Sequence, residues 1–314
     1  MKHLNTLMVL ILTIVFAFAA ASCKSTPPQP EPPHQVSPPP PLPSPPPPPP
    51  PAEQEAEPEA EIDTSLPEIT VSMSPQPFSP DGDGVDDLLT VHITVTSPTE
   101  IGGWHIEIRE PEPPYGVFSE WSDLGMPPEE LEWDGLSADG ELVQSASNYY
   151  FAISVSNAYG AATYQGTFEI DVLVNREGDV LRAIVPSIVF PPNSGNFTGL
   201  DGETESDNDY ILKRIAEVLN RYSTYRVTVE GHANPTTLPG TRQRAAEEAG
   251  TRTVKGLKAL SEERAHAIVN YLVDLGVERS RLSAIGAGGT RTVADFEDRD
   301  HWWKNRRVEF ILEK

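Results

Sequence analysis

The chain has 314 residues, a formal net charge of −24, 33 prolines and a single cysteine. This length allows about two domains plus tails. The acidic excess is uneven, because residues 201–314 hold 18 Lys and Arg against 19 Asp and Glu, whereas the remainder holds 5 against 28. Phosphate contacts need clustered Lys and Arg, so this distribution argues against nucleic-acid binding.

Residues 1–22 are typical of an export signal. Lys2 and His3 precede an apolar run that extends to Ala21 and ends in small residues. A retained membrane helix is the alternative, but three polar residues shorten the apolar run below the usual length of a span. They are Asn5, Thr6 and Thr13. We therefore predict a signal peptide over residues 1–22.

The only cysteine, Cys23, directly follows Ala20-Ala21-Ser22. A single cysteine cannot form an internal disulfide. The pattern resembles a bacterial lipobox, although Ala20 replaces the leucine preferred there. The resemblance implies a diacylglyceryl group on Cys23 and cleavage before it. Lys24 and Ser25 follow Cys23 where an inner-membrane lipoprotein has an acidic retention residue, which by the same resemblance favours the outer membrane.

Residues 23–65 hold proline runs at 38–41 and 45–51 and a Glu/Ala/Pro stretch at 53–61. Neither composition can bury a core, and proline-rich chain adopts stiff polyproline II. We predict a disordered linker that, at about 3.1 Å per residue, reaches roughly 120 Å over residues 24–62. A lipid anchor followed by such a linker and a binding domain would form a tether. An SH3-type ligand has little support in an exported chain.

Residues 66–175 show short alternating runs that read as strands, separated by Pro, Gly, Asn and Asp. The runs are residues 88–95, 104–108, 149–155 and 166–172. This pattern predicts an antiparallel β-sandwich. The motifs Phe78-Ser-Pro-Asp-Gly-Asp-Gly-Val-Asp-Asp87 and Trp133-Asp134-Gly135 resemble the immunoglobulin-like domain of the flagellar hook-capping protein FlgD.

The acidic loop in the first of these motifs has two interpretations. Asp81, Asp83 and Asp86 offer the carboxylate oxygens that calcium prefers, but the spacing is not that of an EF-hand. Asp-Gly pairs also make turns in which the side chain caps nearby amides, and we favour this interpretation. His92 and His105 are interpreted as ordinary strand residues, because no metal-binding spacing links them.

The region from residue 180 onwards predicts a two-layer α/β domain. Strands are expected at 183–190, 225–231, 281–286 and 307–312, with helices after Asp207 and over 260–275. Pro186 suggests an edge position or a bulge in the first strand. The βαβαββ-like order is satisfied by two helices on one face of a mixed sheet.

The second helix contains an unusual arginine. Ser261 is expected to cap this helix and Gly276 to end it, while Ala265, Ile268, Val269 and Leu272 recur on one face. Arg264 then falls near the third helical position, where the helix dipole disfavours a cation by roughly 0.3–1 kcal/mol.

Two explanations for Arg264 are open. Glu262 or Glu263 neutralises it, or it binds a ligand carboxylate through two parallel hydrogen bonds. In the last strand Val308, Phe310 and Leu312 share the face expected to meet the helices. Arg306 has the same parity, so we expect its side chain near Arg264.

Four ordered motifs carry a resemblance over residues 180–314. They are Gly231-His232-Ala233-Asn234, Leu260-Ser-Glu-Glu-Arg264-Ala, Gly276-Val-Glu-Arg-Ser-Arg-Leu282 and Asn305-Arg-Arg-Val-Glu309. Together they resemble the OmpA-like peptidoglycan-binding domain shared with peptidoglycan-associated lipoproteins. The resemblance implies that Arg264 holds the carboxylate of the stem-peptide diamino acid, with Arg306 in support. Asn234 stands where the family usually has the aspartate that receives the ammonium.

The chain departs from the family elsewhere too. Leu257 replaces a usual asparagine, Pro191 replaces a usual aspartate, and 27 positions separate Asn234 from Ser261 where about a dozen are usual. The extra stretch, residues 242–249, is expected to form a short amphipathic helix over the site. Exchanging Asp for Asn could weaken ammonium binding roughly ten- to hundredfold, unless a Glu of the insertion substitutes.

The sequence therefore predicts an outer-membrane lipoprotein with periplasmic domains that tethers the envelope to peptidoglycan. The alternative is a structural interaction lipoprotein with a degenerate pocket, and the immunoglobulin-like domain is a candidate surface for other envelope proteins. No catalytic arrangement, phosphate loop or zinc spacing is legible, so neither an enzyme nor a cofactor is expected. His232 is interpreted as structural, and Trp302 and Trp303 as covering the core.

Overall fold

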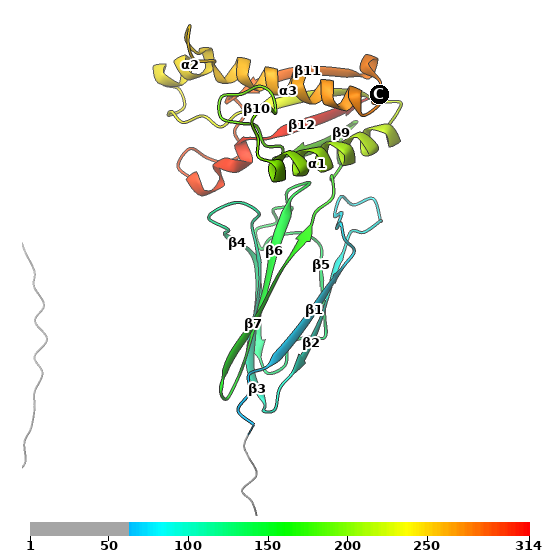
Figure 1. The fold of residues 1–314 in the computed structure, drawn as a ribbon, viewed down its shortest axis with the longest axis vertical. Coiled ribbons are helices and arrows are strands. Elements are labelled where there is room, and N and C mark those ends of the chain that lie inside the picture. The colour runs from blue at the N-terminus through cyan, green and yellow to red at the C-terminus, as the bar shows by residue number, and fades with distance from the viewer. Residues whose placement is uncertain (1–62) are drawn as a thin grey trace, which may run out of the picture. The chain divides into compact units, whose positions relative to one another are not determined.

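Two domains follow one another in the computed structural model, which describes residues 63–314 (Figure 1). The predicted signal peptide, the lipid site at Cys23 and the linker up to residue 62 lie outside the described residues. Within residues 63–314, no helix is both long and apolar enough to cross a bilayer.

The first domain consists of two antiparallel sheets. One has the order β1-β2-β5 and the other β4-β3-β6-β7. The strands are β1 Glu68–Ser74, β2 Leu89–Thr96, β3 Ile101–Arg109, β4 Val117–Leu124, β5 Glu130–Trp133, β6 Asn148–Asn157 and β7 Gly160–Glu169. The four predicted runs overlap β2, β3, β6 and β7, although the last run was placed too late, since β7 ends at Glu169.

Strict alternation along the strands builds a core that the two sheets share. In β6 the side chains of Tyr149, Phe151, Ile153 and Val155 are all fully buried, whereas the intervening residues are not. Each such burial contributes about 1.5–3 kcal/mol. The two sequence motifs meet in this core, with the rings of Phe78 and Trp133 5.8 Å apart.

The second domain is a mixed five-stranded sheet with the order β11-β10-β12-β9-β8, in which only β10 and β11 are parallel. The strands are β8 Asn175–Glu177, β9 Val180–Val185, β10 Arg226–His232, β11 Leu282–Gly288 and β12 Val308–Glu313, and the helices are α1 Gly202–Arg221, α2 Arg242–Ala249 and α3 Leu257–Asp274. Helices α1 and α3 lie on one face of the sheet (Figure 1). Val308, Phe310 and Leu312 are buried in one core cluster with residues of both helices, as predicted.

Two predicted boundaries in this domain were wrong. The first strand ends at Val185 because Pro186 has no N–H for the ladder. Helix α1 begins at Gly202, where the carboxylate of Asp201 accepts a hydrogen bond from the Thr204 amide (2.8 Å), so the helix starts well before Asp207.

Ser261 does not cap α3, which begins one turn earlier at Leu257. Its hydroxyl is fully buried, donates to the carbonyl of Lys258 (3.0 Å) and accepts from the amide of Gly288 (2.9 Å). A side chain at Gly231 would clash with the backbone oxygen of Ser261, so α3 rests directly on the sheet. Arg264 therefore lies two turns into the helix, and the predicted dipole penalty does not apply. Gly276, at φ +90°, follows the helix end as predicted.

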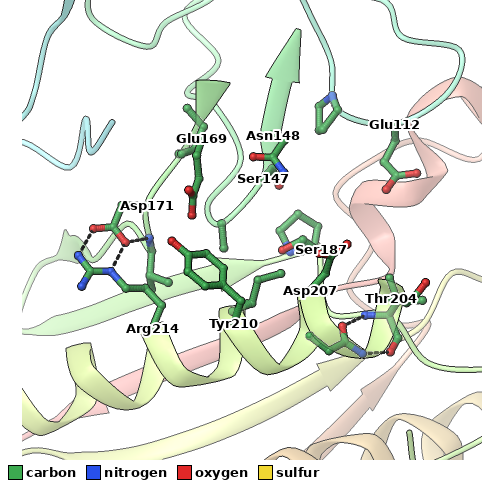
Figure 2. Close-up of a pocket in the computed structure, with 18 of the residues that line it drawn as sticks. Glu112, Ser147, Asn148, Glu169, Asp171, Ser187, Thr204, Asp207, Tyr210 and Arg214 are labelled. Carbon is green, nitrogen blue, oxygen red and sulfur yellow. Dashed lines mark hydrogen bonds and ion pairs between the residues drawn. The ribbon is translucent and has the colours of Figure 1, made fainter. Parts of the chain in front are cut away.

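Ion pairs join the two domains within one compact unit, residues 60–314. Arg214 of α1 donates to both carboxylate oxygens of Asp171, at 2.8 and 2.6 Å (Figure 2). Lys304 bonds to Glu110 (2.8 Å) and Glu141 (2.7 Å) of the first domain. A bidentate guanidinium pair holds its partners in one orientation, so these contacts fix the first domain against the second.

Candidate functional site

A cavity of about 380 Å³ brings together segments from five parts of the chain. Its wall includes the loop between β9 and α1, the end of β10, Arg264 of α3 and the start of β12. A fifth segment comes from the first domain, where Glu112 lies in the loop between β3 and β4. Arg264 and Arg306 both line this cavity, so the structure brings the two predicted arginines together.

The side chain of Arg264 is held from two sides. Its guanidinium lies over the ring of Phe190, with the central carbon 5.0 Å from the ring centroid, and its Nε donates to the carbonyl of Ser194 (3.0 Å). The terminal amino groups have no hydrogen-bond partner among residues 63–314. The guanidinium is thus oriented in advance and keeps the two donors that a carboxylate needs.

Of the two explanations left open for Arg264, neutralisation by Glu262 or Glu263 does not hold. Glu263 pairs instead with Lys255, and no carboxylate of the described chain lies within 4.0 Å of Arg264. Arg306 is exposed and likewise has no ion pair in residues 63–314. Burial lowers the pKa of Arg264, and the positive charge of Arg306 lowers it further. The Arg264 guanidinium remains charged near neutral pH, because the ordinary pKa of arginine lies far above 7.

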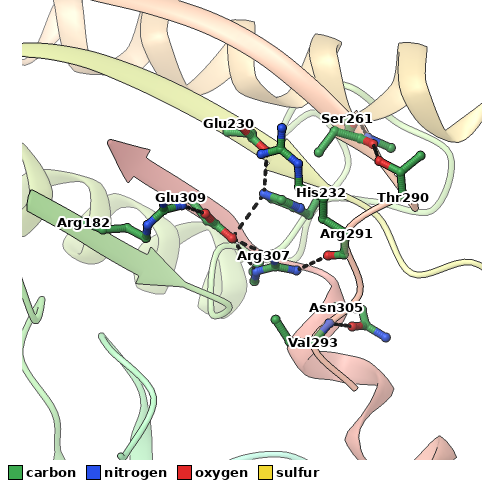
Figure 3. Close-up of polar contacts among 12 residues, drawn as sticks. Arg182, Glu230, His232, Ser261, Thr290, Arg291, Val293, Asn305, Arg307 and Glu309 are labelled. Carbon is green, nitrogen blue, oxygen red and sulfur yellow. Dashed lines mark hydrogen bonds and ion pairs between the residues drawn. The ribbon is translucent and has the colours of Figure 1, made fainter. Parts of the chain in front are cut away.

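A buried polar network lies beside the cavity, on the sheet face opposite α1 and α3 (Figure 3). Arg307 donates to Glu309 through Nε (2.9 Å) and Nη2 (2.6 Å), and Arg182 also pairs with Glu309. On the neighbouring strand Glu230 pairs with Arg291. The alternation of strand β12 explains this arrangement, since Arg307 and Glu309 face away from Val308 and Phe310.

His232 lies inside this network. Its Nε2 is 3.3 Å from both Glu230 and Glu309, and its side chain is almost fully buried. Burial and the charge of Arg307 lower the pKa of His232 to about 4, so the ring is neutral at pH 7. These surroundings support the interpretation of His232 as structural, although its edge also lines the cavity.

Asn234 does not line the cavity. Its Oδ1 accepts a hydrogen bond from Nδ2 of Asn305 (2.9 Å). Asn305 in turn accepts from the amides of Val293 (2.7 Å) and Ala294 (3.0 Å). Asn305, the first residue of the Asn-Arg-Arg motif, thus holds the preceding loop in place. Asn234 contacts Asn305 and does not line the cavity, where a ligand contact was predicted.

The predicted insertion helix is present as α2, but it does not cover the site. Glu247 accepts hydrogen bonds from the amides and hydroxyls of Thr236 and Thr237, and Glu248 accepts from the Gly289 amide (2.7 Å). Because both carboxylates are engaged away from the cavity, neither can replace the missing aspartate.

Trp303 is buried and lines the cavity, whereas Trp302 packs against Phe296, with ring centroids 5.6 Å apart. Trp303 thus forms part of the cavity wall, and the covering role expected of both rings stays a prediction.

The acidic loop of the first domain brings together Asp81, Asp83 and Asp87, so the predicted third member, Asp86, was wrong. The carboxylate of Asp87 accepts hydrogen bonds from the amides of Gly82 (2.8 Å) and Gly84 (2.7 Å). These bonds already use both of its oxygens as acceptors. Burial raises the pKa of Asp81. These contacts are those of an amide-capped turn, the interpretation favoured from the sequence.

His105, Glu107 and Glu120 also cluster, on strands β3 and β4. The ring of His105 lies 3.1 Å from Glu120 and 3.7 Å from Glu107. Arg109 pairs with the same Glu107 at 2.5 Å. The cluster is therefore a network of polar contacts on the outer surface of strands β3 and β4.

The second domain belongs to a class defined by two helices on one face of a mixed sheet, with cationic side chains directed into a cavity at one end. Residues 202–306 match the OmpA family. The C-terminal domain of this chain is therefore an OmpA-like domain.

Curated relatives give the same assignment. The chain is 34% identical over 126 residues to the peptidoglycan-associated lipoprotein of Agrobacterium fabrum, covering 39% of this chain and 63% of the relative. It is 36% identical over 126 residues to that of Mesorhizobium japonicum, covering 39% and 66%. The chain thus spans about two thirds of the length of these relatives.

A solved peptidoglycan-associated lipoprotein from Burkholderia pseudomallei aligns with a TM-score of 0.28 at 21% identity, over 40% of this chain and 88% of that one.

Proposed function

We propose that the C-terminal domain binds the peptide stem of peptidoglycan without covalent chemistry and that the chain tethers the cell envelope to the wall. One observation carries the proposal. Arg264 and Arg306 line the same cavity, and neither has an acidic partner among the described residues. The relatives that match this domain are named peptidoglycan-associated lipoproteins.

The chemistry of the cavity suits a carboxylate. A guanidinium binds a carboxylate through two parallel charge-assisted hydrogen bonds, each of which contributes about 1.5–3 kcal/mol when shielded from water. The exposure of Arg306 reduces its share, so Arg264 is expected to contribute most of the affinity. Loss of Arg264 should weaken binding roughly tenfold or more.

The rest of the chain fits a tether. We propose that Cys23 carries the lipid that anchors the chain to the outer membrane, and that residues 23–65 form the linker that spans the distance to the wall. Residues 66–175 form an immunoglobulin-like sandwich in this proposal, with envelope proteins as its candidate partners. The folded domains would lie in the periplasm and carry no enzymatic activity.

Affinity for the wall is expected to be altered compared with the relatives. Asn234 replaces an acid with a neutral amide, and its oxygen is already used by Asn305. The same observation favours a second candidate function, in which the pocket is degenerate and the chain acts as an interaction scaffold in the envelope.

Co-sedimentation with purified sacculi tests the proposal. The chain without residues 1–23 should pellet with sacculi, and Arg264→Ala should reduce the pelleted fraction. Arg252→Ala is a matched control, because Arg252 is exposed and does not line the cavity. Equal pelleting of wild type and Arg264→Ala would exclude the arginine site.

Absence of all pelleting, together with retained association of the lipidated chain with envelope proteins, would favour the scaffold. Palmitate labelling of wild type against Cys23→Ser tests the anchor separately. Equal labelling of the two proteins, or no label on either, would exclude Cys23 as the lipid site.

A further inference from the structure

Glu112 is an acidic residue of the first domain that lies in the wall of the arginine cavity. It also lines the adjoining cavity of about 500 Å³ (Figure 2). The two cavities share Pro186, Val189 and Trp303. Its side chain is half-buried and has no hydrogen bond or ion pair within residues 63–314. The cavity therefore contains two unpaired cations and one unpaired anion, supplied by different domains.

The loop that carries Glu112 is held in place. The amide of Glu110 donates to the carbonyl of Gly116 (2.9 Å), and the amide of Tyr115 donates to the carbonyl of Glu112 (2.8 Å). These bonds close the loop between β3 and β4 on itself. The Glu112 carboxylate is thus presented by a closed turn, which reduces the entropy lost when a ligand binds.

A buried ion pair connects this loop to the arginine side of the cavity. Glu110 bonds to Nζ of Lys304 at 2.8 Å, and both side chains are less than one tenth exposed. Lys304 lies in the 3₁₀ helix Arg299–Asn305, directly after Trp303 and two residues before Arg306. The contact therefore sets the position of Glu112 relative to Arg306, although the two residues belong to different domains.

We propose that Glu112 receives the ammonium group of the bound ligand, so that the first domain completes the binding site of the second. This proposal rests on the proposed function. A cavity lined by cationic and anionic side chains, with the apolar side chains of Phe190 and Trp303 in the same wall, fits a ligand with a carboxylate, an ammonium and methylene groups between them. A diamino acid has this chemistry.

With Glu112 as the acid, Asn234 is free to bond to Asn305 and hold the neighbouring loop. The acid that a diamino ligand requires is supplied by the first domain, so position 234 is released from ligand contact. It also gives the first domain a role in recognition beyond that of a spacer.

Paired ligands isolate the contribution of the ammonium. Binding of 2,6-diaminopimelate and of pimelate, which is the same diacid without amino groups, would be measured by NMR titration. The protein is the chain without residues 1–23, as wild type and as Glu112→Gln. Glu132→Gln serves as a matched control, because Glu132 is an exposed glutamate of the first domain outside the cavity.

Glu112→Gln should weaken diaminopimelate binding about three- to tenfold, a reduced effect because the carboxylate is partly solvated. It should leave pimelate binding unchanged or slightly stronger. Arg264→Ala should weaken both ligands. Unchanged diaminopimelate affinity in Glu112→Gln, or equal weakening of both ligands, would overturn the role of Glu112. If wild type binds neither ligand, the proposed function itself fails.

Discussion

Glu309 offers a direct test of the energetics of the buried polar network. Its carboxylate accepts two hydrogen bonds from Arg307, at 2.9 and 2.6 Å, and pairs with Arg182. Glu309→Gln keeps the shape but removes the charge, which leaves Arg307 buried without a counter-ion. Breaking a buried pair costs about 3–5 kcal/mol. The expected loss in free energy of unfolding is at the low end of this range, about 3 kcal/mol, because the amide oxygen of the new Gln side chain still accepts a hydrogen bond.

Urea and thermal unfolding at pH 7 would measure this loss. A chain of this size changes its Tm by about 2–4 °C per kcal/mol, so Glu309→Gln should unfold roughly 6–12 °C lower. Glu313→Gln, at the exposed end of the same strand, should change stability by no more than about 0.5 kcal/mol. Equal stability of the two variants would refute the reasoning, because the network would then contribute nothing beyond a surface charge.

The pH dependence follows from the same contacts. Burial alone would raise the pKa of Glu309, but Arg307, His232 and Arg182 together lower it below its ordinary value. The stabilisation is therefore present above the unfolded pKa and lost as the pH falls through the folded pKa. The difference between wild type and Glu309→Gln should shrink in that acidic range.

Three further predictions concern the neighbouring structure. Gly231→Ala should lower the free energy of unfolding by about 1–3 kcal/mol in a urea titration, because the added methyl group would clash with the backbone of α3. Ser261→Ala should cost about 1–3 kcal/mol in the same assay, since the Gly288 amide loses its acceptor; an unchanged midpoint would contradict this. The His232 ring should stay neutral until about pH 4 in an NMR titration, and its contribution to stability should decline as the pH falls from the ordinary histidine range toward that value.

The sequence predicted those features that depend on periodicity. The buried face of α3, formed by Ala265, Ile268, Val269 and Leu272, follows from helical spacing, and each of these side chains is fully buried. The alternation of β12 likewise placed Arg306 on the side of Arg264, and both line one cavity. Periodicity predicts these positions because each helix and each strand buries the same face along its whole length.

Helix starts were harder to predict. Ser261 satisfies the local rule for a cap, but Leu257 and Leu260 extend the apolar period one turn earlier, and burial of Leu260 overrides the local preference. The first turn of α1 has no apolar residue to mark it, so the sequence predicted a helix only after Asp207. Burial of Leu260 thus decided where α3 begins, whereas the local cap of Asp201 on the Thr204 amide marks the start of α1.

The position of Glu112 in the cavity wall could not be predicted from the sequence. It lies in a proline-rich turn between two strands, where an acidic residue gives no signal of binding. Its relevance arises only from contacts between residues far apart in the sequence, such as Glu110 with Lys304. The two arginines, by contrast, were marked in the sequence: Arg306 by the alternation of the last strand, and both residues by the motifs that carry the resemblance.

The position of β12 has a consequence for how the second domain assembles. This strand lies between β10 and β9, which do not pair with each other, and its partner β9 begins more than a hundred residues earlier in the chain. Closing such distant segments slows folding. Until β12 docks, β9 and β10 each present an open row of backbone hydrogen-bonding groups, which can capture a strand from another molecule. Aggregation during refolding is therefore expected to depend on how quickly this one strand inserts.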